Sequence, residues 1–356
     1  MKSRSIWPRA LVLSLLLAAS DSEIQTVSAA SLTKPSAAVQ KVQEAKQAPA
    51  LNARQKNAER LELFEKIGTL TGIPWAYLAA VDQYERTMNI ARKRPIHEGS
   101  ISIYFPPAEW VGLMNPDQQD TNPQTIALFN GFGKDGSGDG IADRTNDLDL
   151  LASMTSLMTK LGHKEEQIQI SLWNYYQNSR SVERIKEFAT IYSAFGTLDL
   201  DEHAFPLPVT ADYSYHSTWG AGRGWGGHRI HEGTDLFARH GVPVRSTCYG
   251  IVEIKGWNPY GGWRIGIRDV NNLYHYYAHL SGYQKGIKEG DIVKPGQVIG
   301  WVGSSGYGKK GTSGKFPPHL HFGLYRDNGL AEWSFDPYPS LRKWEREDWT
   351  RRKSQH

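Results

Sequence analysis

Four histidines and one aspartate in the carboxy-terminal half of the 356-residue sequence have the types and spacing of a metal site. His231 and Asp235 lie in HEGTD, His279 ends YHYYAHL, and His319 and His321 flank a leucine in PPHLHFGL. Because even separations place side chains on one face of a strand, His231 with Asp235, and His319 with His321, can each point into one cleft. Two neutral imidazoles and one carboxylate with an open fourth position form the donor set of a catalytic zinc site, whereas closed structural sites usually use four ligands rich in cysteine.

The other histidines and the single cysteine have plainer interpretations. A histidine outside such a pair is more often a surface or core residue, and this interpretation applies to His216, His228, His240 and His275. The only cysteine, Cys248, cannot form an intramolecular disulfide, and its apolar, strand-like surroundings predict a buried side chain.

Glycine punctuation indicates that the histidine-bearing half is built from strands. Of the 35 glycines, 24 lie from residue 206 onward, between short β-branched and aromatic runs, a pattern typical of an all-β domain. The composition changes near 200–210, where Pro206 and Pro208 mark the boundary, and we therefore place this domain at 206–340. The charged segment that follows, 341–356, is predicted to be a solvated helical tail.

The preceding half is predicted to be helical. From 56 to 200 apolar residues recur at helical spacing, as in LELFEKIGTL and VERIKEFATIYSAF. Residues 31–55 are rich in Ala, Lys, Gln and Ser and lack aromatic residues, which predicts a linker or a frayed helix. The fold class is therefore two domains, helical and then β.

The first thirty residues have the pattern of a secretory signal peptide. Lys2, Arg4 and Arg9 precede an apolar run over 10–19, and small residues follow at 28–30. The run is shorter than the roughly 20 residues of a spanning helix, so we expect export, with membrane contact only if this segment stays uncleaved. The 41 Lys and Arg against 37 Asp and Glu are too balanced to indicate a nucleic-acid partner.

The histidine motifs, together with the turn-strand-turn segment GDIVKPGQVIGWVGSSG, resemble in order and spacing the lysostaphin/LytM-type zinc metallopeptidases, which hydrolyse peptide bonds in peptidoglycan. The resemblance covers about 220–325 and implies an antiparallel sheet with a groove between loops. It implies one zinc ion held by His231, Asp235 and His321, and non-ligand catalytic histidines at His279 and His319. Zinc lowers the pKa of bound water toward about 7, and an imidazole can accept its proton or stabilise an oxyanion.

The walls of such a groove would come from glycine-rich segments that also carry aromatic residues. Aromatic faces can pack on sugar rings or peptides, although core packing explains many single cases. The candidates are Trp219, Trp225, Tyr260, Trp263 and Tyr307. For Arg229 two interpretations stay open: a residue that lines the cleft, or a solvated charge.

The helical half carries a weaker likeness, in GIPWAYLAAVDQYER, to the lysozyme-like lytic transglycosylase fold. In that family a catalytic glutamate follows LAA by about five residues, which implies Glu85 here. Two departures matter: Arg86 follows the glutamate directly, and Tyr104 stands where the family has a glutamine-bearing segment. An arginine that reached the carboxylate would favour its ionised form, whereas a general acid needs a raised pKa. We therefore expect this half to bind or position the cell wall.

One loop of the helical half matches the first part of a calcium-binding pattern. The matching residues are Asp135, Ser137, Asp139 and Gly140. Asp143 falls near a later ligand position, but Asn146 replaces the glutamate expected at the twelfth. A weak calcium site and a polar turn both remain open.

These observations predict an exported zinc metalloendopeptidase whose partner is peptidoglycan, and the secreted two-part organisation is similar to sporulation-type L-Ala-D-Glu endopeptidases. A non-catalytic peptidoglycan-binding activator of other hydrolases is one alternative, because some members of the resembled family have lost ligands. A glycosidase acting through Glu85 is the other. The oligomeric state does not follow from the sequence.

Overall fold

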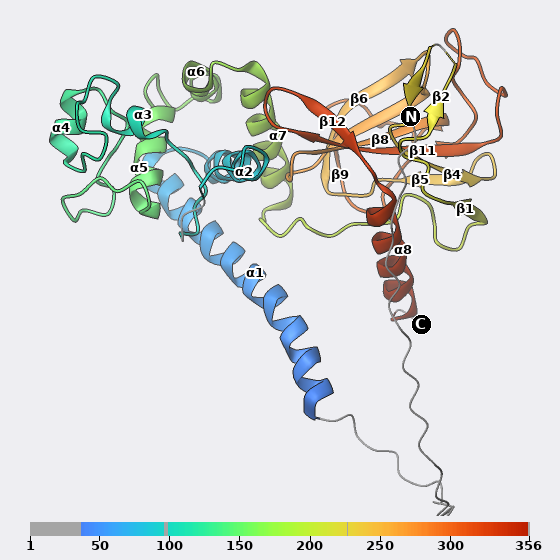
Figure 1. Cartoon of the computed structure of the whole chain (residues 1–356), viewed down its shortest axis with the longest axis horizontal. Coiled ribbons are helices and arrows are strands. Elements are labelled where there is room, and N and C mark those ends of the chain that lie inside the picture. The colour runs from blue at the N-terminus through green and yellow to red at the C-terminus, as the bar shows by residue number, and fades with distance from the viewer. Residues whose placement is uncertain (1–36, 96–98, 226, 355–356) are drawn as a thin grey trace, which may run out of the picture. The chain divides into compact units, whose positions relative to one another are not determined.

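The computed structural model describes residues 37–95, 99–225 and 227–354 (Figure 1). The predicted signal peptide, 1–30, lies outside the described residues. Helix α1 spans Ala37–Thr71, so most of the predicted linker is helical. None of the described helices has both the length and the hydropathy to cross a membrane.

Helices continue to residue 195, as the apolar spacing predicts. After α1 they are α2 (Trp75–Ala91), α3 (Pro107–Val111), α4 (Pro123–Leu128), α5 (Asp147–Met158), α6 (Glu165–Tyr176) and α7 (Ser179–Phe195). Their apolar faces meet in one core, in which Phe64, Leu78 and Phe188 are fully buried. The helical part of the fold class is thereby confirmed, whereas its likeness to lysozyme is not tested by the packing.

Strands follow from residue 213 and form one antiparallel sheet of ten strands, as expected. Its main order is β1-β4-β11-β8-β7-β6-β9, with β10 paired to β5 and β8, and β12 paired to β11; β2 and β3 form a separate ribbon. The strands are β1 (Tyr213–Tyr215), β2 (Gly222–Arg223), β3 (Arg229–Ile230), β4 (Thr234–Ala238), β5 (Pro243–Arg245), β6 (Gly250–Asn258), β7 (Gly262–Arg268), β8 (Leu273–Tyr283), β9 (Ile292–Val293), β10 (Val298–Val302), β11 (His319–Asp327) and β12 (Glu332–Phe335).

The sheet has one face against a second hydrophobic core. Leu236, Leu320 and Phe322 alternate into this core and are fully buried, so the neighbouring odd-numbered residues of β4 and β11 face away from it. Cys248 is also in this core, with 1% of its surface exposed, which confirms the prediction that it is buried.

Helices and strands contact each other within residues 51–356, which form one compact unit. Arg184 of α7 makes an ion pair of 2.6 Å with Glu253 of β6. Val270, in the turn after β7, is part of the helical core. The change from helix to strand after residue 200 is therefore accompanied by direct packing between the two regions.

The final segment is helical, as predicted, and forms α8 (Tyr338–Lys353), but the prediction that it is solvated is wrong, because one face of this helix packs against the sheet core. Leu341 and Trp344 are buried three residues apart, on one face of the helix. Asp348, one turn further on, pairs with Arg245 at 2.6 Å and accepts a hydrogen bond from the backbone amide of Phe205 at 3.1 Å. The many charges on the other faces obscure this stripe in the sequence.

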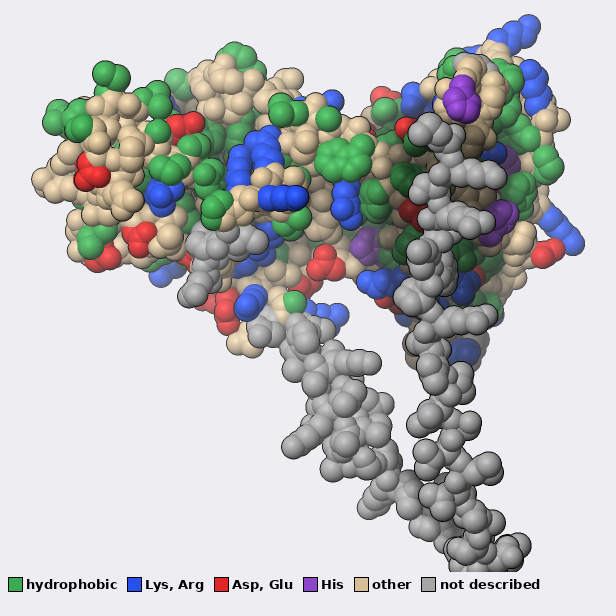
Figure 2. Space-filling view, in the orientation of Figure 1, with side chains coloured by type: hydrophobic (Ala, Val, Ile, Leu, Met, Phe, Trp, Pro, Cys, Tyr) green, Lys and Arg blue, Asp and Glu red, His purple; other side chains and the backbone are tan. Residues whose placement is uncertain are grey.

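Charges of both signs occur on the face of the described chain that Figure 2 shows. Figure 2 shows Lys and Arg side chains interspersed with Asp and Glu on the face in view. This mixture matches the near balance of 41 basic and 37 acidic residues.

We expect Trp344→Ala to lower the free energy of unfolding by about 3–5 kcal/mol, because it empties a large buried volume. Trp349→Ala is the matched control: Trp349 lies on the same helix but is 40% exposed, so its effect should stay within about 1 kcal/mol. Urea unfolding of the full chain measures both. Equal effects of the two substitutions would mean that α8 does not pack as described.

Candidate functional site

Asp235 and His321 are brought together by the register of two neighbouring strands. In the antiparallel pair of β4 and β11, His321 lies opposite Asp235, and His319 lies opposite Phe237. Opposed residues share a face of the sheet, and this face is the one turned away from the core. The even spacing of the HLH motif therefore does place both histidines on one face.

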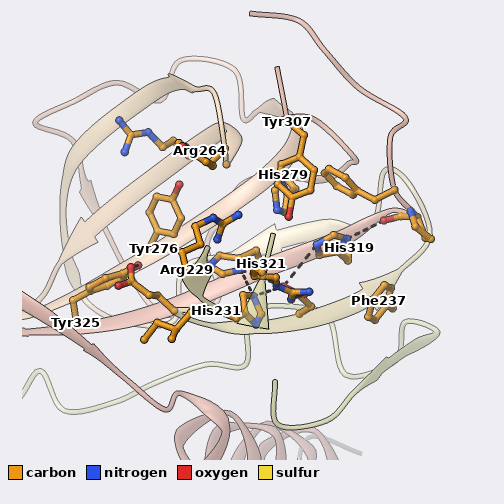
Figure 3. Close-up of a pocket in the computed structure, with 18 of the residues that line it drawn as sticks. Arg229, His231, Phe237, Arg264, Tyr276, His279, Tyr307, His319, His321 and Tyr325 are labelled. Carbon is orange, nitrogen blue, oxygen red and sulfur yellow. Dashed lines mark hydrogen bonds and ion pairs between the residues drawn. The ribbon is translucent and has the colours of Figure 1, made fainter. Parts of the chain in front are cut away.

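His231 reaches the same place from the segment between β3 and β4. Its backbone is fixed on both sides, since its amide donates to the Ala221 carbonyl and its carbonyl accepts from the Gly220 amide, each at 2.8 Å. Figure 3 shows its ring beside that of His321. Thus the three residues that the sequence resemblance named as ligands meet at one point.

The three potential ligand atoms are nearly equidistant. His231 Nε2 lies 2.8 Å from His321 Nδ1 and 3.0 Å from Asp235 Oδ1. His321 Nδ1 lies 3.1 Å from the same carboxylate oxygen. Because metal–ligand distances near 2.0–2.2 Å give ligand–ligand separations of roughly 3.3 Å in a tetrahedron, the triangle fits a single divalent ion after a shift of a few tenths of an ångström.

The protonation pattern also suits a cation. His231 Nδ1 donates to the Thr218 carbonyl at 2.9 Å, which leaves Nε2 with a lone pair in the neutral ring. Burial lowers the pKa of His321 and so favours its neutral form. Burial alone would raise the pKa of Asp235, but its contacts with His231 and His321 hold the pKa well below its usual range, so the carboxylate is charged. Lone pairs and one negative charge thus face one another, an arrangement that a divalent cation stabilises.

Arg223 of β2 contacts the cluster and was missed in the sequence. Its guanidinium donates to Asp235 Oδ2 at 2.6 Å, so the carboxylate presents Oδ1 to the histidines. Thr218 adds a hydrogen bond from the Asp235 backbone amide to its hydroxyl oxygen, 3.2 Å long. Both residues orient the ligands. No spacing rule could have found them, because they lie in an irregular glycine-rich segment.

His279 and His319 flank the triangle with matching hydrogen bonds. His319 Nδ1 donates to the Pro317 carbonyl at 2.8 Å, and His279 Nδ1 donates to the Ser305 carbonyl at 2.7 Å. Burial lowers the pKa of both imidazoles. Their ring centroids are 4.8 Å apart, and His319 Nε2 lies 3.7 Å from Asp235 Oδ1. Each ring therefore keeps its Nε2 lone pair available as a proton acceptor.

A local backbone distortion turns His279 toward the cluster. On a regular strand it would share the core-facing side with Tyr277, yet it lines the same cavity as the ligand residues. Its φ of +62° breaks the alternation of β8, a conformation that costs about 1 kcal/mol or more for a residue with a side chain. Hydrogen bonds from its amide to the Gly261 carbonyl, 2.7 Å, and from its ring to Ser305 hold this geometry.

The five residues lie in a groove of about 650 Å³. Tyr260 and Tyr307 line it, and Trp225 stacks on Tyr307 with centroids 4.7 Å apart. Arg229 also lines the groove, which decides between its two interpretations. Trp219 and Trp263 do not: the Trp219 indole N–H donates to Ser334 Oγ at 3.4 Å, and Trp263 packs on Trp257.

A second group within metal-binding reach comprises His203, Asp269 and His275. Both ring nitrogens of His275 already have partners, Thr247 Oγ1 at 2.6 Å and Asp269 Oδ2 at 3.2 Å. The His203 ring is stacked on Trp344 at 4.8 Å. We interpret the group as a buried polar network beneath α8, and His275 thereby takes the core position, one of the two ordinary roles considered for it.

The calcium hypothesis is not supported. Asp135 accepts hydrogen bonds from the backbone amides of Gly138 and Gly140, at 2.6 and 2.8 Å, and Ser137 donates to the same carboxylate. Asp139 and Asp143 likewise bind backbone amides two residues further on. The Asn146 side chain caps α5. These carboxylates fold the loop on itself instead of converging on one point.

Glu85 is engaged with protein partners on both oxygens. It is 2% exposed, with Oε2 2.7 Å from Arg94 and Oε1 accepting from the Tyr176 hydroxyl at 2.7 Å. Burial raises its pKa, although Arg94 and Tyr176 oppose the shift. Arg86, which follows Glu85 directly in the sequence, does not pair with this carboxylate: it points to Asp82, 3.3 Å away and one helical turn back.

Comparisons with known proteins identify relatives of this chain. Residues 229–334 match Peptidase family M23. The chain is 58% identical over 297 residues to the L-Ala–D-Glu endopeptidase of Bacillus subtilis, covering 83% of this chain and 91% of that protein. Lysostaphin of Staphylococcus staphylolyticus is 38% identical over 115 residues, 32% of this chain and 22% of that protein. The catalytic domain of Staphylococcus simulans lysostaphin aligns at a TM-score of 0.32, with 33% identity, over 40% of this chain and 99% of that structure.

We expect Gly233→Ala to weaken binding of a divalent ion by about tenfold or more, the range seen when support for a ligand is lost. A Cβ at this position would lie 2.7 Å from His321 Nε2 and 2.5 Å from the Phe322 carbonyl oxygen, so the ring must move. Competition with a chelating dye measures the affinity. Gly224→Ala is the control, because its Cβ would meet nothing within 4 Å; equal affinities for both variants would contradict the arrangement.

Proposed function

The chain belongs to peptidase family M23, and on that premise we propose that it is a zinc-dependent endopeptidase that cuts the L-Ala–D-Glu bond of bacterial peptidoglycan. The observation that carries the proposal is the convergence of His231, Asp235 and His321 in a solvent-open groove. The choice of bond is supported by the Bacillus subtilis relative, which is matched along nearly its whole length.

We assign the metal to the atoms that already face one another, namely His231 Nε2, His321 Nδ1 and Asp235 Oδ1. Two imidazoles, one carboxylate and an open position suit catalytic zinc. Zinc, when bound, supplies Lewis acidity that polarises the scissile carbonyl and makes water more acidic. Arg223 and Thr218 hold the ligands in place before the metal arrives.

Proton transfer is assigned to His279 and His319. With Nδ1 fixed on a backbone carbonyl, each neutral ring offers Nε2 toward the groove. Such a nitrogen can take the proton of the attacking water and return it to the leaving amine. The charge of Asp235, 3.7 Å from His319 Nε2, would stabilise the protonated form of that ring.

The two alternatives fit the geometry less well. A non-catalytic activator would not need a complete ligand set together with two neutral histidines beside it. A glycosidase acting through Glu85 would need a carboxyl group that reaches substrate, but this carboxyl group is buried and both of its oxygens are bound.

The proposal extends to the cell wall as partner and to export as route. The signal-like residues 1–30 and the peptidoglycan relatives support a secreted or wall-associated enzyme. The helical region, 56–200, is assigned a lysozyme-like fold that engages the wall, on the strength of the LAA motif in α2. The β region, 206–340, with α8 packed on it, carries the peptidase chemistry.

We expect His321→Ala to abolish the release of new amino groups from purified peptidoglycan, because one of three ligands is lost. His240→Ala, in an exposed turn, should leave the rate unchanged. Mass spectrometry of the fragments identifies the bond: new amino termini should be D-Glu. A wild-type protein that releases no amino groups with zinc supplied would refute the function, and a different new terminus would refute the choice of bond.

We expect Glu85→Gln to leave peptide release intact while lowering the free energy of unfolding by about 1–3 kcal/mol, since Arg94 loses its charged partner. Denaturant unfolding and amino-group release, measured on the same preparation, check both parts. If the folded variant loses the ability to open the wall, or if the wild type releases reducing ends that the variant does not, Glu85 takes part in the reaction.

A further inference from the structure

Two arginines in the groove, Arg229 and Arg264, lack a charge partner in the described part of the chain. Both line the cavity and both are partly buried. Their Nε atoms are buried without a hydrogen-bond partner. By contrast, Arg223 in the same groove is paired with Asp235 at 2.6 Å, and buried Arg268 outside it is paired with Glu253 at 2.7 Å.

The position of Arg229 is fixed by an aromatic ring. Its guanidinium carbon lies 5.1 Å from the centroid of Tyr260. Such stacking orients the guanidinium but does not neutralise its charge. Figure 3 shows Arg229 between Tyr276 and the rings of His231 and His321, so its charge is beside the reaction site.

Arg264 lies further along the same wall, beyond Tyr276 (Figure 3). The two arginines act together on Tyr276: burial raises the pKa of this phenol, and both positive charges oppose the shift. The two carboxylates that line the groove, Asp235 and Glu232, form no ion pair with either arginine. Asp235 is committed to Arg223 and the histidines, and Glu232 accepts a hydrogen bond from the Tyr325 hydroxyl at 3.3 Å.

Partly desolvated guanidinium groups without counter-charges are costly in an empty protein and are stabilised by an anionic ligand. A planar guanidinium binds a carboxylate through two parallel hydrogen bonds. Arg229 is therefore suited to bind a carboxylate close to the bond being cut, and Arg264, on the far side of Tyr276, adds positive charge to the same groove.

The bond proposed above presents such a carboxylate whenever the glutamyl residue is unmodified. A glutamyl residue has two carboxyl groups, and only one of them can continue the peptide. The other is therefore negatively charged near neutral pH, directly on the residue that follows the scissile bond. Conversion of this group to an amide would remove the charge and leave the size almost unchanged.

We propose that Arg229 and Arg264 bind the free carboxylate of the glutamyl residue and thereby make the enzyme select glutamyl over amidated, glutaminyl substrates. The inference rests on the proposed function and adds to it the chemical group by which the substrate is recognised. It predicts that amidation of the cell wall at this residue protects it from the enzyme.

The test measures cleavage of two synthetic peptides by the zinc-loaded full chain. The peptides differ only at the residue after L-Ala: the carboxyl group that does not continue the peptide is free in the glutamyl peptide and an amide in the glutaminyl peptide. We expect kcat/KM to favour the glutamyl peptide by about ten- to a hundredfold in the wild type, the range for a partly solvated charged contact. In the double variant R229Q/R264Q this ratio should fall toward one. R239Q is the control and should keep the ratio, because Arg239 is exposed and lies at 3.7 Å from Asp212, away from the groove.

The outcomes separate this inference from the function on which it rests. Equal cleavage of both peptides by the wild type, or a preference that survives in the double variant, would overturn the role of the arginines while the endopeptidase function stands. If neither peptide is cleaved, the proposed bond is wrong. Calorimetric binding of the same two peptides then decides the arginine assignment: tighter binding of the glutamyl peptide, lost in R229Q/R264Q, supports it, and equal binding refutes it.

Discussion

The alignment of β4 with β11 is the constraint on which the site depends. It places Asp235 opposite His321 on the face of the sheet that is turned away from the core, while Leu236 and Leu320 are buried on the other face. A slip of one residue would move the ligands into the core and the leucines into the groove. The burial of the leucines and Phe322 therefore enforces the geometry of the ligands, and hydrophobic packing and metal chemistry depend on the same pairing.

Much of the site could be predicted because its motifs are local. The even separation within HLH requires no knowledge of distant contacts, and the glycine-rich punctuation predicts the strand that carries it. His231 lies before β4, so its position depends on backbone hydrogen bonds to Gly220 and Ala221 and not on strand alternation. His279 is different, because alternation along β8 would turn it inward and only a left-handed backbone turns it outward. The sequence analysis assigned His279 to the site from the family resemblance and not from the periodicity of the strand. Arg223 and Thr218 were missed because they act from an irregular segment, where the sequence has no repeating pattern.

The helical region and the final helix show the limits of sequence reasoning. The helices of 56–200 follow from their apolar spacing. The ion-pair partner of Glu85 could not be predicted in this way. Arg86, next to it in the sequence, points to another side of the helix, and the partner is Arg94, which lies beyond the end of α2. For α8, a high density of charge suggested solvent exposure, whereas two apolar residues one turn apart suffice to bury one face. Overall charge is thus a poor guide where a helix needs only a narrow contact.

The single thiol of the chain has a practical consequence. Cys248 is enclosed by the sheet core, and burial raises its pKa well above the usual value, so the reactive thiolate is scarce while the fold is closed. An alkylating reagent added to the native protein would therefore modify this sulfur only when the core opens. Because this is the single thiol, the rate of labelling would report how often the core around Cys248 opens, and it would do so without an introduced probe.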